Sequence, residues 1–152
     1  MGLLQTRHTS DGKDLGIFIK NMNIYLDIDG VLLANEYNLS EGAVDLIKHI
    51  TEKYDVYWLT TQCMDGDPAW AIEYINRASE EDLTLWLNKI KPTSWEEHKT
   101  EAIDFSKPFY WLDDDQYEEE KAELEKHDSM SSFIPIDLQS DPSDLINKTK
   151  KL

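Results

Sequence analysis

Short runs of apolar residues alternate with segments of helical periodicity from Asn23 to the end of the chain. A short apolar run bounded by turn residues is typical of a strand that is buried on both faces. Apolar residues spaced i, i+3, i+4 and i+7 instead form one face of a helix. The alternation of the two patterns predicts an α/β fold, in which a parallel sheet carries helices on both faces as three α/β/α layers.

Candidate strands fall where β-branched, aromatic and aliphatic residues cluster between turn-forming residues. The clearest are residues 24–28, 56–59, 109–112 and 132–136. Residues 83–90 fit either a strand or a helix, and their run of Thr, Leu, Trp and Leu favours a strand beside residues 56–59.

Helix signals lie between these strands. An apolar stripe runs from Ala43 to Tyr54, and Asn38 or Ser40 would cap it. Asp-Pro pairs predict helix starts at 67–68 and 141–142, and a capping box at 94–97 predicts a helix to about residue 104. A charged helix is expected over 118–127, where the glutamates at 118–120 suit the helix N-terminus and have only a structural role.

The length of 152 residues fits one domain, which we assign to residues 22–152. Residues 1–21 are polar and lack an apolar period, so we expect a loosely ordered extension or a short extra strand there. No apolar run approaches the roughly 20 residues of a membrane span, and no secretory signal is evident. The single cysteine, Cys63, fits a reducing compartment, and a cytoplasmic location is therefore predicted.

The net charge is −16, from 31 acidic and 15 basic residues. Nucleic-acid binders gain much of their affinity from lysines and arginines that neutralise phosphates. An extended nucleic acid is therefore an improbable partner unless a local basic patch exists, and Lys89, Lys91, Lys99 and Lys107 are the available lysines near the expected site.

Polar residues follow three of the predicted strands. Asp27 and Asp29 end the first strand, Thr60 and Thr61 follow the second, and Asp113-Asp114 follows the strand at 109–112. The carboxyl ends of parallel strands meet at one edge of a sheet, where ligands bind. Clustered carboxylates repel one another unless a cation lies among them, and oxygen ligands alone favour a hard ion such as Mg²⁺. The sequence therefore predicts a magnesium site at this edge.

The string Asp27-Ile28-Asp29-Gly30-Val31 resembles the first motif of the haloacid-dehalogenase-like (HAD) superfamily of hydrolases. Thr60 resembles its second motif, Lys99 its third and Asp113-Asp114 its fourth, in the same order along the chain. Residues 58–61, 95–100 and 108–114 are similar to a small group of such domains that also occurs in bacterial RNA-repair proteins.

The resemblance implies a HAD-like, Rossmann-like fold and a phosphatase that forms an aspartyl-phosphate. Asp27 would be the nucleophile and Asp29 the general acid and base. Mg²⁺ would be held by Asp27, by Asp29 through its carbonyl, and by Asp113 and Asp114.

Thr60, Thr61 and Lys99 would hold the phosphate oxygens in such an enzyme, although Lys91 is an alternative to Lys99. The short segments between the motifs leave no room for a sizeable cap domain. A phosphorylated small molecule or protein is the expected substrate. A polynucleotide-end phosphatase and a non-catalytic phosphate-binding scaffold remain the alternatives.

Overall fold

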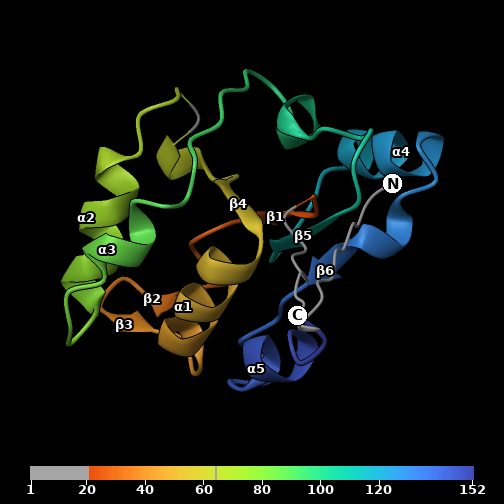
Figure 1. Cartoon of the computed structure of the whole chain (residues 1–152). Helices are drawn as coiled ribbons and strands as arrows, with labels where there is room; N and C mark the ends of the chain where they lie inside the picture. Colours follow the sequence, from red (N-terminus) through yellow and green to blue (C-terminus); the bar gives the residue numbers. More distant parts are fainter. Residues whose placement is uncertain (1–20, 64) are drawn as a thin grey trace, which may run out of the picture.

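The computed structural model of the chain describes residues 21–63 and 65–152. Its centre is a parallel sheet of four strands in the order β4-β1-β5-β6 (Figure 1). The strands are β1 (Asn23–Leu26), β4 (Asp55–Trp58), β5 (Phe109–Asp113) and β6 (Phe133–Pro135). Leu26 pairs with Trp58 on one side and with Leu112 on the other, so β4, β1 and β5 end at about the same level.

Helices cover both faces of the sheet, which confirms the predicted three-layer α/β architecture. One face carries α1 (Ala43–Lys53), α2 (Ala69–Ala78), α3 (Thr84–Leu87) and α5 (Asp144–Lys148). The other face carries α4 (Glu118–Lys126) and the 3-10 helix η2 (Lys99–Ala102). The remaining elements are η1 (Thr61–Cys63), η3 (Met130–Ser132) and a hairpin of β2 (Leu33–Asn35) and β3 (Asn38–Leu39).

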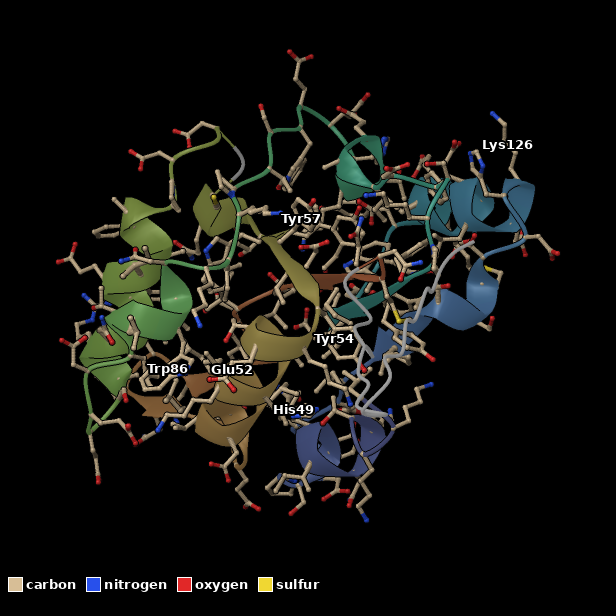
Figure 2. The ribbon with its side chains drawn as sticks, viewed as in Figure 1. His49, Glu52, Tyr54, Tyr57, Trp86 and Lys126 are labelled. Atoms are coloured by element: carbon tan, nitrogen blue, oxygen red, sulfur yellow. The ribbon has the colours of Figure 1, made fainter. Side chains whose placement is uncertain are left out.

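Side chains of β1 alternate between two apolar clusters, one on each face of the sheet. Ile24 and Leu26 pack with α1 and α2, whereas Tyr25 packs with Leu124 of α4. A strand that is buried on both faces has no polar alternation, which explains the continuous apolar run in the sequence. On α1, His49 lies near the C-terminal segment, and its Nε2 is 2.8 Å from the Leu152 carbonyl oxygen (Figure 2).

The predicted strand at residues 83–90 is wrong, because residues Thr84–Leu87 form α3. Leu83 and Leu87 lie one helical turn apart and are both fully buried. The Asp82 carboxylate accepts the Thr84 backbone N–H at 2.9 Å, which favours a helix start over a strand. Strand-like pairing with β4 occurs just after this segment, as one isolated parallel bridge between Lys91 and Tyr57.

The predicted helix from Ser94 to Asp104 is also wrong, since only η2 forms and its capping box pairs His98 with Glu101. The Glu101 carboxylate accepts backbone N–H groups of residues 96, 97 and 98, at 3.0, 3.1 and 2.9 Å. These hydrogen bonds hold the segment in a loop, because the N–H groups are bound by a side chain and not by the backbone carbonyls of a helix.

Neither predicted cap of α1 is its N-cap, which is Gly42 with φ of 82°. Asn38 belongs to the β2–β3 hairpin, and the Ser40 hydroxyl donates to the Val31 carbonyl at 2.6 Å. The Asp67 carboxylate does accept the Ala69 backbone N–H at the start of α2, at 3.0 Å.

The described residues contain no separate cap domain, as predicted. The segment from Asp29 to Ser40 forms only the β2–β3 hairpin, and α2 and α3 lie between Thr60 and Lys99. Within residues 21–63 and 65–152, none of the helices has the length and apolar character that a membrane span requires. The predicted extension at 1–21 lies, except for Asn21, outside the described residues, and the single-domain assignment stays a prediction.

Candidate functional site

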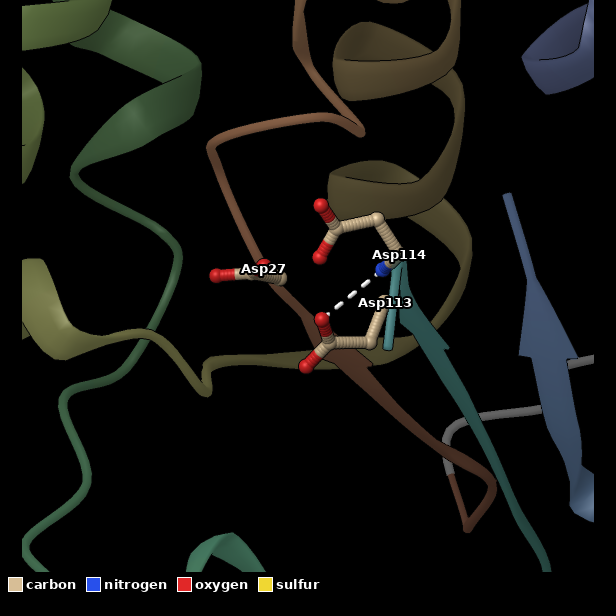
Figure 3. A group of neighbouring side chains, drawn as sticks. All are labelled: Asp27, Asp113 and Asp114. Carbon is tan, nitrogen blue, oxygen red and sulfur yellow. Dashed lines mark hydrogen bonds between the residues drawn. The ribbon is translucent and has the colours of Figure 1, made fainter. Parts of the chain in front are cut away.

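Three carboxylates converge at the carboxyl edge of the sheet (Figure 3). One oxygen each of Asp27, Asp113 and Asp114 lies within 4.8 Å of the other two. Backbone pairing produces this arrangement, because the Asp27 N–H donates to the Leu112 carbonyl at 3.0 Å and so keeps the two chains aligned beyond β1. The group could hold a metal ion, and its oxygen donors suit a hard divalent cation.

Asp113 is the most enclosed of the three, with 2% of its surface exposed. Its Oδ2 accepts the indole N–H of Trp111 at 3.1 Å and an N–H of the Lys99 ammonium at 2.6 Å. Its Oδ1 accepts the Asp114 backbone N–H at 2.8 Å (Figure 3). These donors fix the direction of the carboxylate and partly offset its burial.

Lys99 lies between two carboxylates. Its Nζ is 2.6 Å from Asp113 Oδ2 and 3.5 Å from Asp27 Oδ1. The alternative lysine, Lys91, is placed elsewhere: its Nζ is 3.5 Å from Asp55 and lies over the Tyr57 ring. Of the two lysines that the sequence offered, Lys99 is therefore the one that the fold brings to the acidic group.

Burial raises the pKa of all three carboxyls in the acidic group. The pKa of Asp113 rises to about 7, because burial and the charge of Asp27 outweigh the stabilising Lys99 ammonium. Burial and the neighbouring Asp113 raise the pKa of Asp114 to about 6. Burial also raises the pKa of Asp27, which Lys99 counteracts in part. The group therefore carries more negative charge than its one lysine offsets, and a bound cation would relieve the excess.

The pKa of Lys99 itself is shifted upward. Burial alone would lower this pKa, but the carboxylates of Asp27 and Asp113 outweigh burial. The lysine is therefore held in its charged form, as a group that binds phosphate oxygens must be.

The other predicted residues lie around the acidic group. Asp29 is exposed, and its Oδ2 accepts an N–H of Gln62 at 3.2 Å. Thr60 is fully buried, and its side chain forms a hydrogen bond with Asp27 that favours the ionised carboxylate. Thr61 is exposed at the start of η1. The Asp29 side chain is not part of the carboxylate group, which leaves its predicted metal contact to the backbone carbonyl.

Gly30 is required by a close approach. Its φ is +79°, and a Cβ at this position would lie 2.5 Å from Asp114 Oδ2. Glycine therefore allows both the turn after Asp29 and the contact with the Asp114 carboxylate.

A pocket of about 390 Å³ opens over the acidic group. Among the described residues, seven carboxylates line it and Lys99 is its one basic residue. Its full lining is Asp27, Asp29, Thr61, Trp95, Glu97, Lys99, Asp113, Asp114, Asp115, Gln116, Tyr117 and Glu120. Lys89, Lys91 and Lys107 are not among these residues, so the four lysines named from the sequence do not form one patch at the pocket.

Sequence reasoning missed several of the residues around the pocket. Gln62 carries no local signal that links it to Asp29. Glu120 was assigned to the helix N-terminus alone, although it also lines the pocket. Trp70 is 54% exposed beside Thr61 in a neighbouring depression.

Comparison of the chain with protein-family models, curated proteins and solved structures finds no match. The parallel sheet and the carboxylate group at its edge are therefore the features from which a function must be argued.

Proposed function

We propose that this chain is a magnesium-dependent phosphatase of the HAD-like kind that hydrolyses phosphate esters through an aspartyl-phosphate on Asp27. One observation carries the proposal: the Lys99 ammonium lies against both Asp27 and Asp113 at the carboxyl edge of a parallel sheet. Their order along the chain is the order of the HAD motifs, and Gly30 lies where the first motif has its glycine.

The donor set fits Mg²⁺. Asp27, Asp113 and Asp114 provide oxygen ligands only, and burial, the main cause of their raised pKa values, disfavours their ionised forms unless a cation lies among them. The Asp29 backbone carbonyl would add a fourth oxygen. A bound Mg²⁺ would reduce the repulsion between the attacking carboxylate and the phosphate.

The chain's own residues would perform two displacements at phosphorus. In the first, an oxygen of Asp27 forms a bond to phosphorus while the ester P–O bond breaks, and the leaving oxygen takes a proton from Asp29. In the second, Asp29 removes a proton from water, whose oxygen bonds to phosphorus and releases Asp27. Thr60, Thr61 and Lys99 would bind the phosphoryl oxygens.

We propose a phosphorylated small molecule or protein segment as the substrate. The charges that line the pocket support this choice, because seven carboxylates and one lysine would repel the backbone of an oligonucleotide. A single phosphate brings far less negative charge to the pocket than an oligonucleotide backbone does.

A panel of phosphomonoesters, assayed with and without Mg²⁺, tests the proposal. We expect hydrolysis that stops on chelation and is abolished in Asp27→Asn. Asp45→Asn, the same change on an exposed position of α1, is the matched control and should retain wild-type activity.

Hydrolysis that survives chelation, or that Asp27→Asn retains, would exclude the proposed mechanism. A kcat/KM that is higher for a 3′-phosphorylated oligonucleotide than for every small ester would overturn the proposed substrate class and favour an RNA end.

A further inference from the structure

The Glu120 carboxylate joins two segments of the chain that carry residues of the pocket. It is 3% exposed, and its two oxygens accept different backbone N–H groups. Oε1 accepts the N–H of Tyr117 at 2.8 Å, and Oε2 accepts the N–H of Lys99 at 2.8 Å. One buried carboxylate therefore links the N-terminus of α4 to the first residue of η2.

Helix capping explains only half of this geometry. Glu120 is the third residue of α4 and forms a capping box with Tyr117, which needs one oxygen. The second oxygen reaches a residue 21 positions earlier in the chain. Glu118 and Glu119, which share the first turn of α4, are exposed, whereas the acceptor of the Lys99 N–H is the buried Glu120.

The contact falls on the residue whose placement matters most. Lys99 has a long side chain with four rotatable bonds, and its Nζ must lie between Asp113 and Asp27. The Glu101 carboxylate binds the N–H groups of residues 96, 97 and 98, and the next N–H along the chain, that of Lys99, is bound by Glu120 instead. A hydrogen bond between the Lys99 N–H and a buried charged acceptor fixes the point from which the side chain starts.

We propose that Glu120 is a positioning residue that holds Lys99 in place to bind the phosphoryl group. The inference rests on the proposed function for the role of Lys99, whereas the link between Glu120 and Lys99 can be tested without it. The negative charge of Glu120 also favours the protonated Lys99, alongside the larger effects of Asp27 and Asp113.

Glu120→Gln tests the link directly. Its amide keeps one acceptor oxygen, so it can bind the N–H of Tyr117 or of Lys99 but not both. Glu118→Gln is the matched control, because it removes the same charge from the same helical turn at an exposed position. Glu119 is less suitable, since its carboxylate lies 4.0 Å from His98.

The first measurement is binding of inorganic phosphate in the presence of Mg²⁺, by calorimetry. We expect Glu120→Gln to weaken it about tenfold, the size of one lost charge-assisted hydrogen bond. In a Lys99→Ala background the same substitution should have almost no further effect, because a positioning residue acts through the lysine. An equal loss in both backgrounds would mean a merely structural role and would overturn the proposal.

The second measurement needs no phosphate. Acetylation of lysines, followed by peptide mass spectrometry, reports how firmly the Lys99 amine is held relative to that of exposed Lys107. Lys99 should react slowly in the wild type and in Glu118→Gln, and several-fold faster in Glu120→Gln. Unchanged labelling of Lys99 in Glu120→Gln, and also in Glu120→Ala, which removes both acceptor oxygens, would overturn the proposal.

Two further outcomes separate the inference from the proposed function. Faster labelling in Glu120→Gln, together with no binding of phosphate by the wild type, would contradict the phosphatase and support the Glu120–Lys99 link. If Glu120→Gln does not fold, Glu120→Asp keeps the charge on a side chain shorter by one methylene. It should show the same faster labelling, and wild-type labelling would overturn the link.

Discussion

Without magnesium, the protein should become less stable as the pH rises from weakly acidic to weakly alkaline. The cause is Asp113, whose ordinary pKa of 3.8 is raised to about 7 in the fold, first by burial and then by the charge of Asp27. A carboxyl with a higher pKa in the folded protein holds its proton more tightly there than in the unfolded chain. The contribution of Asp113 to the free energy of unfolding is complete below the pKa that the carboxyl has in the unfolded chain. It is lost as the pH rises through the pKa that the carboxyl has in the folded protein.

The expected magnitude follows from this shift. Each pKa unit corresponds to about 1.4 kcal/mol, and roughly two units of the shift act between about pH 5 and about pH 8. Asp113 alone should therefore lower the free energy of unfolding by about 3 kcal/mol over that range. Asp114, with its pKa raised to about 6, acts in the same direction, but its exposure to solvent reduces its contribution.

Urea denaturation, followed by tryptophan fluorescence in a chelator, measures this dependence. Asp113→Asn cannot titrate at this position and should remove most of the pH dependence, whereas Asp45→Asn, on the exposed face of α1, should leave it unchanged. Excess Mg²⁺ should raise the Tm, and by more at the alkaline end, because it binds the ionised carboxylates. The same pH dependence in wild type and Asp113→Asn would refute the reasoning.

Two further substitutions test individual residues of the site. Asp29→Asn should slow turnover by about 10²–10⁴-fold with little change in Mg²⁺ dependence, because it removes proton transfer but keeps the backbone carbonyl. A wild-type kcat in this variant would exclude Asp29 as the general acid and base. Gly30→Ala should raise the Mg²⁺ concentration needed for half-maximal activity. The added Cβ would lie 2.5 Å from Asp114 Oδ2, so the Asp114 carboxylate would have to move. An unchanged Mg²⁺ titration would show that Asp114 is not a ligand.

The sheet and its polar edge were predictable because both follow from local patterns. Apolar runs identify strands that are buried on two faces, and a parallel arrangement brings their carboxyl ends together. The register of β1 with β5 then places Asp27 beside Asp113 although 86 residues separate them. No knowledge of the loops is needed for that result.

The segment from 83 to 104 was not predictable in this way, because specific side-chain hydrogen bonds and packing contacts determine it. A strand and a short helix are both compatible with residues 84–87, and the choice depends on Asp82, Asn76 and the packing of Leu87. Likewise, Ser94 and Glu97 match a capping box, but Glu101 binds the N–H groups that a helix would have required. Residue propensity alone does not show which of these competing side-chain contacts will form.

Lys99 shows how the two kinds of information combine. The helix expected at 94–104 is absent, yet the Lys99 Nζ lies 2.6 Å from Asp113. The Lys99 backbone N–H is bound by the Glu120 carboxylate of α4. No pattern in the sequence around Lys99 predicts this hydrogen bond. A buried carboxylate group with raised pKa values and one lysine weakens the fold, and such local conflicts are expected at functional sites. The contacts that hold Lys99 are therefore better explained by a role in binding than by stability.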